Sequence, residues 1–247
     1  EVVDFGFKKV PKSDKTLLAQ QVFTSVADRY NLMNDLMSLG LHRRWKNSLI
    51  QRLHLRNDMT VFDVASGTGD ISMGIARRAK KKEISINLIS VDLTESMLRI
   101  GRNNSLDKGF VSDISWINAD GAHLPVCTKS IDAYTIAFGI RNMTDLTSAL
   151  DEAYRVLRPG GQFLCLEFSR ISPSLETLYN AYSFNVMPML GKIISNDKKS
   201  YTYLVESIRK FPDQNEFIEY CNNAKFSNIN CQRLSGGIAT IYSAWRL

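Results

Sequence analysis

The chain has 247 residues, of which 44% are hydrophobic and 23% are charged, and its formal net charge is +6. This length suits one α/β domain with an elaboration, and the composition excludes a disordered or fibrous chain. No apolar run approaches the roughly 18–20 residues that a membrane-spanning helix needs. The basic residues are scattered, and the run at 80–82 resembles a solvated helix end, so we expect no nucleic-acid partner.

The spacing of the cysteines and histidines indicates neither a disulfide framework nor a metal site. The four cysteines show no C-x-x-C pattern, which favours reduced thiols in an intracellular compartment. The three histidines lack ligand spacing, so we expect no metal site. The chain begins at Glu1 rather than methionine, which is compatible with removal of a targeting segment.

The N-terminal region divides into two parts. Residues 1–20 are charged and lack a clear period, so we expect a flexible, loosely ordered segment, followed by a single domain over 21–247. Residues 21–57 show helical spacing of apolar side chains, with Gly40 as a break between helices. We expect this helical part either to pack as a side wall on a sheet or to form a lid over a ligand site.

The middle of the chain alternates between strand and helix patterns. We predict strands at 60–65, 85–91, 115–119, 130–137 and 162–168, with helices at 70–80, from 95 and at 145–157, and a tight turn at 158–161. This alternation predicts a mostly parallel sheet with right-handed crossovers. Ligands bind such sheets at the carboxyl ends of the strands, where Asp63, Asp92, Asp120 and residues 138–142 all lie.

The last part of the chain changes character. Residues 171–224 read as a helical insertion rich in tyrosine and methionine, with a separate short helix at 214–224. Two strands at 228–234 and 238–244, joined across Gly236 and Gly237, predict a hairpin that adds an antiparallel strand to the sheet. The sheet would then have seven strands.

The glycine turn after the first strand of the sheet indicates a cofactor. Gly67 and Gly69 lie between that strand and a helix, where small residues let the backbone approach a ligand. Asp92 follows about twenty residues later, where a carboxylate can accept from both hydroxyls of a ribose. This arrangement fits NAD or S-adenosylmethionine equally.

Three features favour S-adenosylmethionine. The third glycine of the dinucleotide fingerprint is replaced by Ser72, Asp120 lies where it can meet an adenine amino group, and the hairpin replaces a second dinucleotide-binding half. We expect Asp63 to accept hydrogen bonds from turn amides or from a cationic group of the ligand.

Several motifs carry a family resemblance. They are the stretches at 26–38, 40–46, 63–71, 134–142, 155–161, 164–169 and 200–209, of which Phe-Gly-Ile-Arg-Asn at 138–142 is the most distinctive. The chain resembles the ubiquinone/menaquinone biosynthesis C-methyltransferase family, and most closely its mitochondrial members. The resemblance implies the class I S-adenosylmethionine-dependent methyltransferase fold, which is Rossmann-like, with a cofactor-binding core at 58–170 and a C-terminal hairpin at 225–247.

The resemblance also implies site residues. The cofactor-binding positions are Asp63, Gly67, Thr68, Gly69, Asp92, Leu93, Asp120, Gly121 and Phe138. The chain departs from the family pattern at Ser66 and at Gly121, and we expect the second change to loosen the adenine loop.

The implied reaction transfers a methyl group to a ring carbon of a polyprenylated methoxy-benzoquinol in ubiquinone biosynthesis. We expect Arg141 and Asn142 to orient the ring hydroxyl, with Arg141 stabilising a phenolate or positioning a water because its guanidinium stays protonated. The alternative is a structural arginine that binds loop carbonyls. Tyr30 is a further candidate for substrate or cofactor contact, with core packing as its alternative.

The resemblance implies partners and a location as well. We expect the insertion at 171–224 to contact the isoprenoid tail, a membrane or a second copy of the chain. We also expect peripheral binding to the matrix side of the mitochondrial inner membrane, with the bacterial cytoplasm as the alternative, and other ubiquinone-biosynthesis proteins as partners.

Four rival functions stay open. They are a demethylmenaquinol methyltransferase, a non-catalytic scaffold of a quinone-biosynthesis complex, an RNA or protein methyltransferase, and an NAD-linked oxidoreductase.

Overall fold

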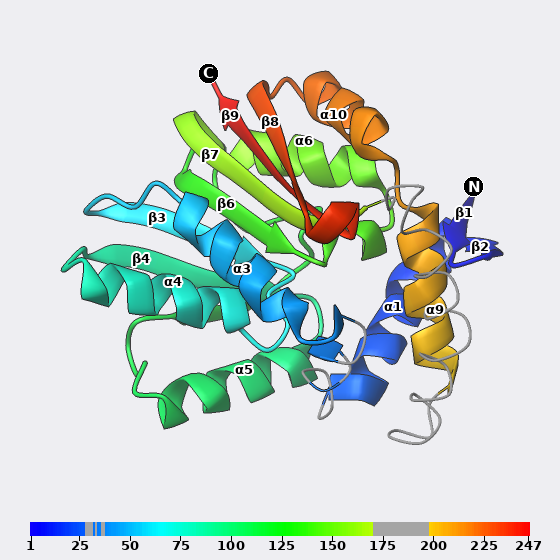
Figure 1. Ribbon diagram of the computed structural model, residues 1–247, viewed down its shortest axis with the longest axis horizontal. Helices are drawn as coiled ribbons and strands as arrows, with labels where there is room; N and C mark the ends of the chain where they lie inside the picture. The colour runs from blue at the N-terminus through cyan, green and yellow to red at the C-terminus, as the bar shows by residue number, and fades with distance from the viewer. Residues whose placement is uncertain (28–31, 33, 36–37, 170–197) are drawn as a thin grey trace.

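A seven-stranded sheet organises the computed structural model, which describes residues 1–27, 32, 34–35, 38–169 and 198–247 (Figure 1). The strands lie in the order β5-β4-β3-β6-β7-β9-β8. Their bounds are β3 Met59–Val64, β4 Ile86–Asp92, β5 Ser115–Asn118, β6 Ile131–Ala137, β7 Leu157–Phe168, β8 Ser227–Leu234 and β9 Ala239–Arg246. β3 to β7 pair in parallel, whereas β9 runs antiparallel to both β7 and β8.

Helices cover both faces of the sheet (Figure 1). Side chains alternate between the faces along a strand, so Phe163 of β7 joins the core under α6 (Leu146–Val156) and α10 (Gln214–Asn223). Leu164, the next residue, joins the core under α3 (Leu41–Arg52) and α4 (Asp70–Lys81). This burial on both sides holds the strand ends that carry the site in fixed positions.

The remaining elements are α5 (Glu95–Asp107), which packs on β4 and β5, and the N-terminal elements with α9 (Lys198–Lys210). Helix α5 follows β4, while α1 (Lys12–Val26) and α9 lie side by side next to a two-stranded sheet (Figure 1). Two short 3-10 helices are also present: η2 (Ile140–Asn142) follows β6, and η4 (Ser235–Gly237) precedes β9. No helix in the described part of the chain is long and apolar enough to cross a membrane.

The strands and helices predicted for residues 58–168 and 214–247 are confirmed to within a few residues. One difference concerns β7, which begins at Leu157 rather than after the turn at 158–161. Leu157 pairs with Ile131, and a register shift between Ile131 and Ala133 accommodates the extra residues. The segment predicted as a turn therefore lies within the bounds of β7, at an irregularity in the pairing of β7 with β6.

The prediction of a loosely ordered segment over residues 1–20 is wrong. β1 (Val2–Phe5) and β2 (Lys8–Pro11) form an antiparallel hairpin around Gly6, and α1 then begins at Lys12 rather than near Gln21. Charged residues hid the short apolar alternation of this hairpin. Of the helical insertion predicted for 171–224, α9 and α10 lie in the described residues, and the part at 170–197 lies outside them.

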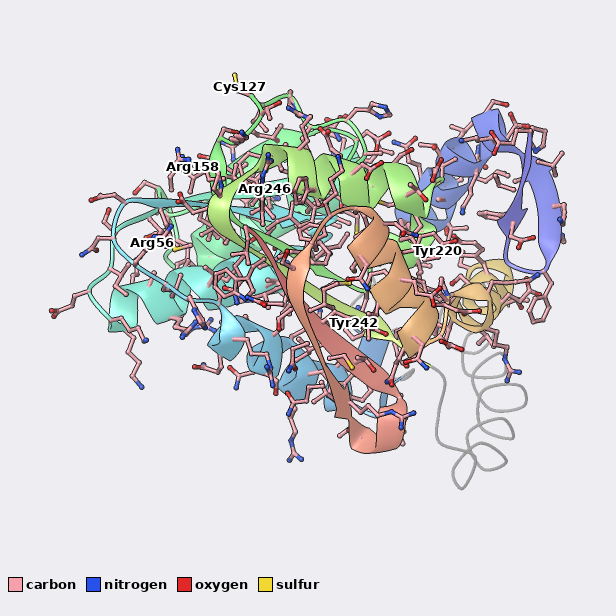
Figure 2. All side chains as sticks on the ribbon, turned by 90° about the horizontal axis from the view of Figure 1, so that it is seen from above. Arg56, Cys127, Arg158, Tyr220, Tyr242 and Arg246 are labelled. Atoms are coloured by element: carbon pink, nitrogen blue, oxygen red, sulfur yellow. The ribbon has the colours of Figure 1, made fainter. Side chains whose placement is uncertain are left out.

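The amino ends of the strands carry a structural cluster rather than a site. Asp132, at the start of β6, binds Arg56 at 3.0 Å and Arg158 at 3.2 Å. Figure 2 shows Arg56 and Arg158 at the end of the molecule opposite the N-terminal hairpin. The carboxyl ends of the strands, near α1, are where the functional groups gather.

Candidate active site

A cavity of about 420 Å³ lies at the carboxyl ends of β3, β4, β5 and β6. This volume is in the range of small-molecule sites. Its lining comes from α1, from the loops after these strands and from the start of α6: Lys12, Thr16, Ala19, Gln20, Phe23, Ala65, Gly67, Asp92, Leu93, Thr94, Met97, Ala119, Asp120, Gly121, Ala122, His123, Phe138, Gly139, Asn142, Met143, Thr144, Asp145 and Ser148. The cavity therefore joins the predicted strand ends in a single site.

Asp92, the last residue of β4, ties two loops of the cavity together. Its Oδ2 accepts from the backbone N–H of Gly67 at 2.8 Å, and its Oδ1 accepts from that of Thr94 at 2.8 Å. Burial raises the pKa of this carboxyl, and these backbone N–H groups oppose the rise. Because each carboxylate oxygen has a further lone pair, Asp92 can also accept from ligand hydroxyls.

Two glycines shape the turn after β3. Gly67 and Gly69 both adopt a left-handed conformation, with φ of 54° and 77°. A Cβ on Gly69 would lie 2.4 Å from the ring of Trp116. The turn thus brings backbone close to the cavity at Gly67, as a cradle for the polar part of a cofactor requires.

Two further glycines of the cavity lining pack too closely against their neighbours for a Cβ to fit. A Cβ on Gly121 would lie 2.6 Å from Cε of Met143 and 2.7 Å from Cγ1 of Val64, and one on Gly139 would lie 2.5 Å from Cβ of Ala65. Met143 and Val64 thus pack against Gly121, while the expected loosening of the adenine loop stays a prediction.

Backbone strain gathers at the ends of the two central strands. Ala65 follows β3 with φ of 51°, and Phe138 follows β6 with φ of 56°, although neither residue is glycine. Such conformations are disfavoured for side chains with a Cβ and concentrate at functional sites. Both residues line the cavity, and the ring of Phe138 is held between Trp45 and Phe168, with centroids 6.3 Å and 4.6 Å away.

The segment after β6 presents Asn142 rather than Arg141 to the cavity. Nη1 of Arg141 donates to the carbonyl of Phe138 at 2.6 Å and to Oε1 of Glu167 at 2.8 Å. Burial raises the pKa of the Glu167 carboxyl, and Arg141 opposes this rise. This is the structural arrangement that the sequence left as the alternative for Arg141.

Asp63 is buried behind the cavity and does not line it. Its carboxylate accepts from the hydroxyls of Ser72 at 2.5 Å and Thr135 at 3.0 Å, and the backbone N–H of Ser72 in the first turn of α4 also interacts with it. Burial raises the pKa of Asp63 to about 6. Ser72, which replaces the third glycine of the dinucleotide fingerprint, thus fastens α4 to β3.

Helix α1 covers the cavity, so the N-terminal helices supply both a lid and a side wall. Nε2 of Gln20 donates to the carbonyl of Leu93 at 2.9 Å. Nζ of Lys12 lies 3.1 Å from Oδ2 of Asp145, which caps α6. Helix α3 is the side wall, since its buried Trp45 and Leu49 pack on the sheet.

The predicted site residues fall into three groups. Seven of them line the cavity: Gly67, Asp92, Leu93, Asp120, Gly121, Phe138 and Asn142. Four lie adjacent to it without lining it: Asp63, Thr68, Gly69 and Arg141. Tyr30 lies outside the described residues.

Sequence reasoning missed the face that α1 turns to the cavity. Its residues are Lys12, Thr16, Ala19, Gln20 and Phe23. These positions repeat at helical spacing and were a readable signal, but the helix was predicted to start too late. Among the described residues, no group of three or more histidine, cysteine or acidic side chains is placed to hold a metal ion.

Comparison of the chain with known proteins shows which family it belongs to. A model of the ubiE/COQ5 methyltransferase family matches residues 8–246. The chain belongs to this family. It is 48% identical over 245 residues to the ubiquinone/menaquinone biosynthesis C-methyltransferase UbiE of Rickettsia bellii, covering 99% of this chain and 98% of the relative. It is also 48% identical over 251 residues to the UbiE protein of Bradyrhizobium diazoefficiens, covering 100% and 98%.

Solved structures agree on the fold. A possible histamine N-methyltransferase from Thermotoga maritima superposes with a TM-score of 0.63 at 16% identity, covering 93% of this chain and 100% of that one. A phosphoethanolamine N-methyltransferase from Haemonchus contortus, in complex with S-adenosyl-L-methionine, gives 0.57 at 13% identity, covering 81% and 52%. The chain is a class I S-adenosylmethionine-dependent methyltransferase.

The residues present fit this cofactor. Gly67 brings backbone to the cavity, Asp92 offers carboxylate oxygens for ribose hydroxyls, and Asp120 with Gly121 borders the same space. Gly121 and Gly139 also line this cavity.

Proposed function

We propose that this methyltransferase methylates a ring carbon of 2-methoxy-6-polyprenyl-1,4-benzoquinol in ubiquinone biosynthesis. The full-length similarity to ubiquinone/menaquinone biosynthesis C-methyltransferases supports a quinol substrate. The observation that carries the proposal is that one cavity holds both the Asp92 carboxylate and the Asn142 carboxamide. The first can bind a cofactor ribose and the second can bind a ring hydroxyl.

In this proposal the cofactor supplies an electrophilic methyl group on sulfonium. Gly67, Leu93 and Asp120 line its binding site, with Asp92 as acceptor for the ribose hydroxyls. Asp63, Thr68 and Gly69 support this cradle from behind. Helix α1 lines the cavity and excludes water from that side, and Gln20 of this helix donates a hydrogen bond to the carbonyl of Leu93.

The acceptor ring must become electron-rich before its carbon can attack. Loss of a phenolic proton to water would move charge onto the ortho carbon, the atom that would take the methyl group supplied by S-adenosylmethionine. The ring carbon afterwards loses its own proton to restore aromaticity. We propose that Asn142 donates a hydrogen bond to the phenolate oxygen and that Arg141 shapes the turn from behind. Tyr30 stays a candidate for substrate contact.

Methyl transfer tests the proposal directly. The purified chain is incubated with labelled S-adenosylmethionine and either a short-tailed methoxy-benzoquinol or a short-tailed demethylnaphthoquinol. We expect label in the benzoquinol at a rate well above that for the naphthoquinol. Preferential labelling of the naphthoquinol would favour the demethylmenaquinol alternative, and cofactor binding without transfer to either would favour the scaffold.

We also propose peripheral binding to an anionic membrane surface, because the polyprenyl tail keeps the substrate in a bilayer. A groove of about 410 Å³ between α3 and α4 supports this, since its lining includes Arg43, Lys46, Arg77, Arg78, Lys81 and Lys108. Lys46 binds Asp70 at 2.7 Å. Arg77, Lys81 and Lys108 are exposed and make no ion pair with a described residue. Positive charge of this kind attracts anionic leaflets.

Vesicle sedimentation at low salt tests this second proposal. A triple variant with Arg77→Gln, Lys81→Gln and Lys108→Gln should lose most binding to cardiolipin-containing vesicles. The matched control removes three exposed cations elsewhere (Lys8→Gln, Lys129→Gln and Lys225→Gln) and should retain it. A wild-type chain that stays in the supernatant would refute membrane binding.

The resemblance also supports two further proposals: a homodimer, and a complex with other ubiquinone-biosynthesis proteins. The relatives reported above are bacterial. They support the bacterial-cytoplasm alternative over the mitochondrial matrix as the compartment.

A further inference from the structure

Helix α9 carries the stretch at 200–209 that the sequence singled out without assigning it a role. Tyr203 of this helix is buried, with 5% of its surface exposed. Its ring stacks on Phe5 of the N-terminal hairpin, with centroids 4.2 Å apart and planes at 23°. Its hydroxyl reaches Asn142 of η2, so three distant parts of the chain meet at this tyrosine.

The contact between Tyr203 and Asn142 fixes the orientation of a cavity residue. Oη of Tyr203 lies 3.1 Å from Oδ1 of Asn142 and donates to it. Within the described part of the chain, Nδ2 of Asn142 makes only a long contact, 3.4 Å, with the carbonyl of Phe138. A carboxamide has one acceptor atom and two N–H donors. With its oxygen engaged by Tyr203, Asn142 offers a ligand in the cavity N–H groups.

Burial of Tyr203 keeps its hydroxyl in the protonated form that donates to Asn142. Arg141 and Glu167 are the charged neighbours, and they pair with each other at 2.8 Å. Burial raises the pKa of Tyr203 to about 12. The hydroxyl is therefore protonated at neutral pH and donates, whereas a phenolate would instead accept from the amide and turn it around.

We propose that Tyr203 is a positioning residue that holds Asn142 with its N–H group available to the oxygen of the acceptor ring that gains negative charge. This inference rests on the proposed function and adds to it a reason why α9 contributes to catalysis. A donor placed in advance stabilises charge as it develops, without reorganisation at the moment of reaction. The Phe5 stack restricts the ring and so the position of Oη.

The variant Tyr203→Phe removes the hydroxyl and keeps the ring that stacks on Phe5. We expect kcat for the benzoquinol to fall about tenfold, which corresponds to the net contribution of one hydrogen bond. The Kd for S-adenosylmethionine and the KM for the quinol should change less than about twofold, because the lost interaction acts on the developing charge.

A double-mutant cycle separates positioning from a general structural effect. In an Asn142→Ala background, Tyr203→Phe should change kcat less than about twofold, because nothing remains to be positioned. A tenfold loss in both backgrounds would overturn the proposal. The amide NH₂ signals of Asn142 in ¹⁵N spectra provide a readout without substrate: Tyr203→Phe should shift or broaden them, and unchanged signals would also overturn it.

Tyr242 of β9 gives a matched control (Figure 2). It is buried like Tyr203, but its hydroxyl has no hydrogen-bond partner in the described part of the chain. Tyr242→Phe should leave kcat unchanged. If the wild-type chain fails to methylate the quinol, the proposed function fails, while the spectra still decide whether Tyr203 holds Asn142.

Discussion

Nη1 of Arg141 lies 2.8 Å from Oε1 of Glu167, and the two side chains are 3% and 0% exposed. A buried pair of this kind adds little stability relative to apolar residues, but removing one partner leaves a buried charge uncompensated. Arg141 also donates to the carbonyl of Phe138, whose φ is positive. The pair therefore holds the strained turn that carries Asn142.

We expect Glu167→Gln to destabilise the fold by about 3–5 kcal/mol and to lower kcat, although Glu167 does not line the cavity. Urea unfolding and methyl-transfer kinetics measure the two effects. Asp113→Asn, which breaks the exposed pair between Lys80 and Asp113, is the control and should cost less than about 1 kcal/mol. Full stability and turnover in Glu167→Gln would mean that the turn does not depend on this pair.

Asp92→Asn should weaken S-adenosylmethionine binding by about 10- to 100-fold, since a charge-assisted hydrogen bond contributes about 1.5–3 kcal/mol. The carboxamide of the new asparagine also places an N–H donor opposite the backbone N–H of Gly67 or Thr94, where Asp92 has an acceptor. Calorimetric titration measures the loss, with the exposed Asp107→Asn as control. Because burial raises the pKa of Asp92, wild-type affinity should fall as pH drops through a value above the usual range of an aspartate. Equal affinity in Asp92→Asn would place the cofactor elsewhere.

The strand ends were predictable because one simple signal fixes them. Apolar β-branched runs locate β3, β4 and β6, and the carboxyl ends of parallel strands meet at one edge, so Asp92 and Asn142 had to lie close together. The sequence identified that edge correctly. It could not decide which neighbouring side chain faces the ligand.

Two residues show why the rest was not predictable. Arg141 precedes Asn142 in the same motif, but only the buried Glu167 from β7 explains why its guanidinium points away from the cavity. Asp63 lies at a strand end like Asp92, yet Ser72 and Thr135 occupy its oxygens. Both outcomes depend on partners in other helices and strands, which the local pattern of the sequence does not contain.

Gly139→Ala should affect both stability and cofactor binding. The added Cβ would lie 2.5 Å from Cβ of Ala65, so the ends of β3 and β6 must move apart, at about 1–3 kcal/mol. We expect the Kd for S-adenosylmethionine to rise tenfold or more. Gly160→Ala is the control: its φ is 78° but nothing lies within 4 Å of the added Cβ, so it should cost about 1 kcal/mol and leave the Kd unchanged. An unaltered Kd in Gly139→Ala would contradict this placement of the cavity floor.

The buried Asp63 should make stability depend on pH in an unusual direction. Its pKa rises from 3.8 to about 6 on folding, so the folded state binds the proton more tightly. The stability from this group is complete below about pH 4 and is lost as pH rises through 6, a change of about 3 kcal/mol. Most buried acidic groups paired with a cation show the opposite trend.

The variant Asp63→Asn isolates this effect because an amide does not ionise. The difference in unfolding free energy between variant and wild type should shift in favour of the variant by about 3 kcal/mol from pH 4 to pH 7. Urea unfolding at intervals across this range measures it, and other titrating groups cancel in the difference. Since the hydroxyl of Ser72 lowers the pKa of Asp63, Ser72→Ala should move the midpoint of the curve to higher pH. A flat difference would show that Asp63 ionises as an ordinary aspartate in the folded protein.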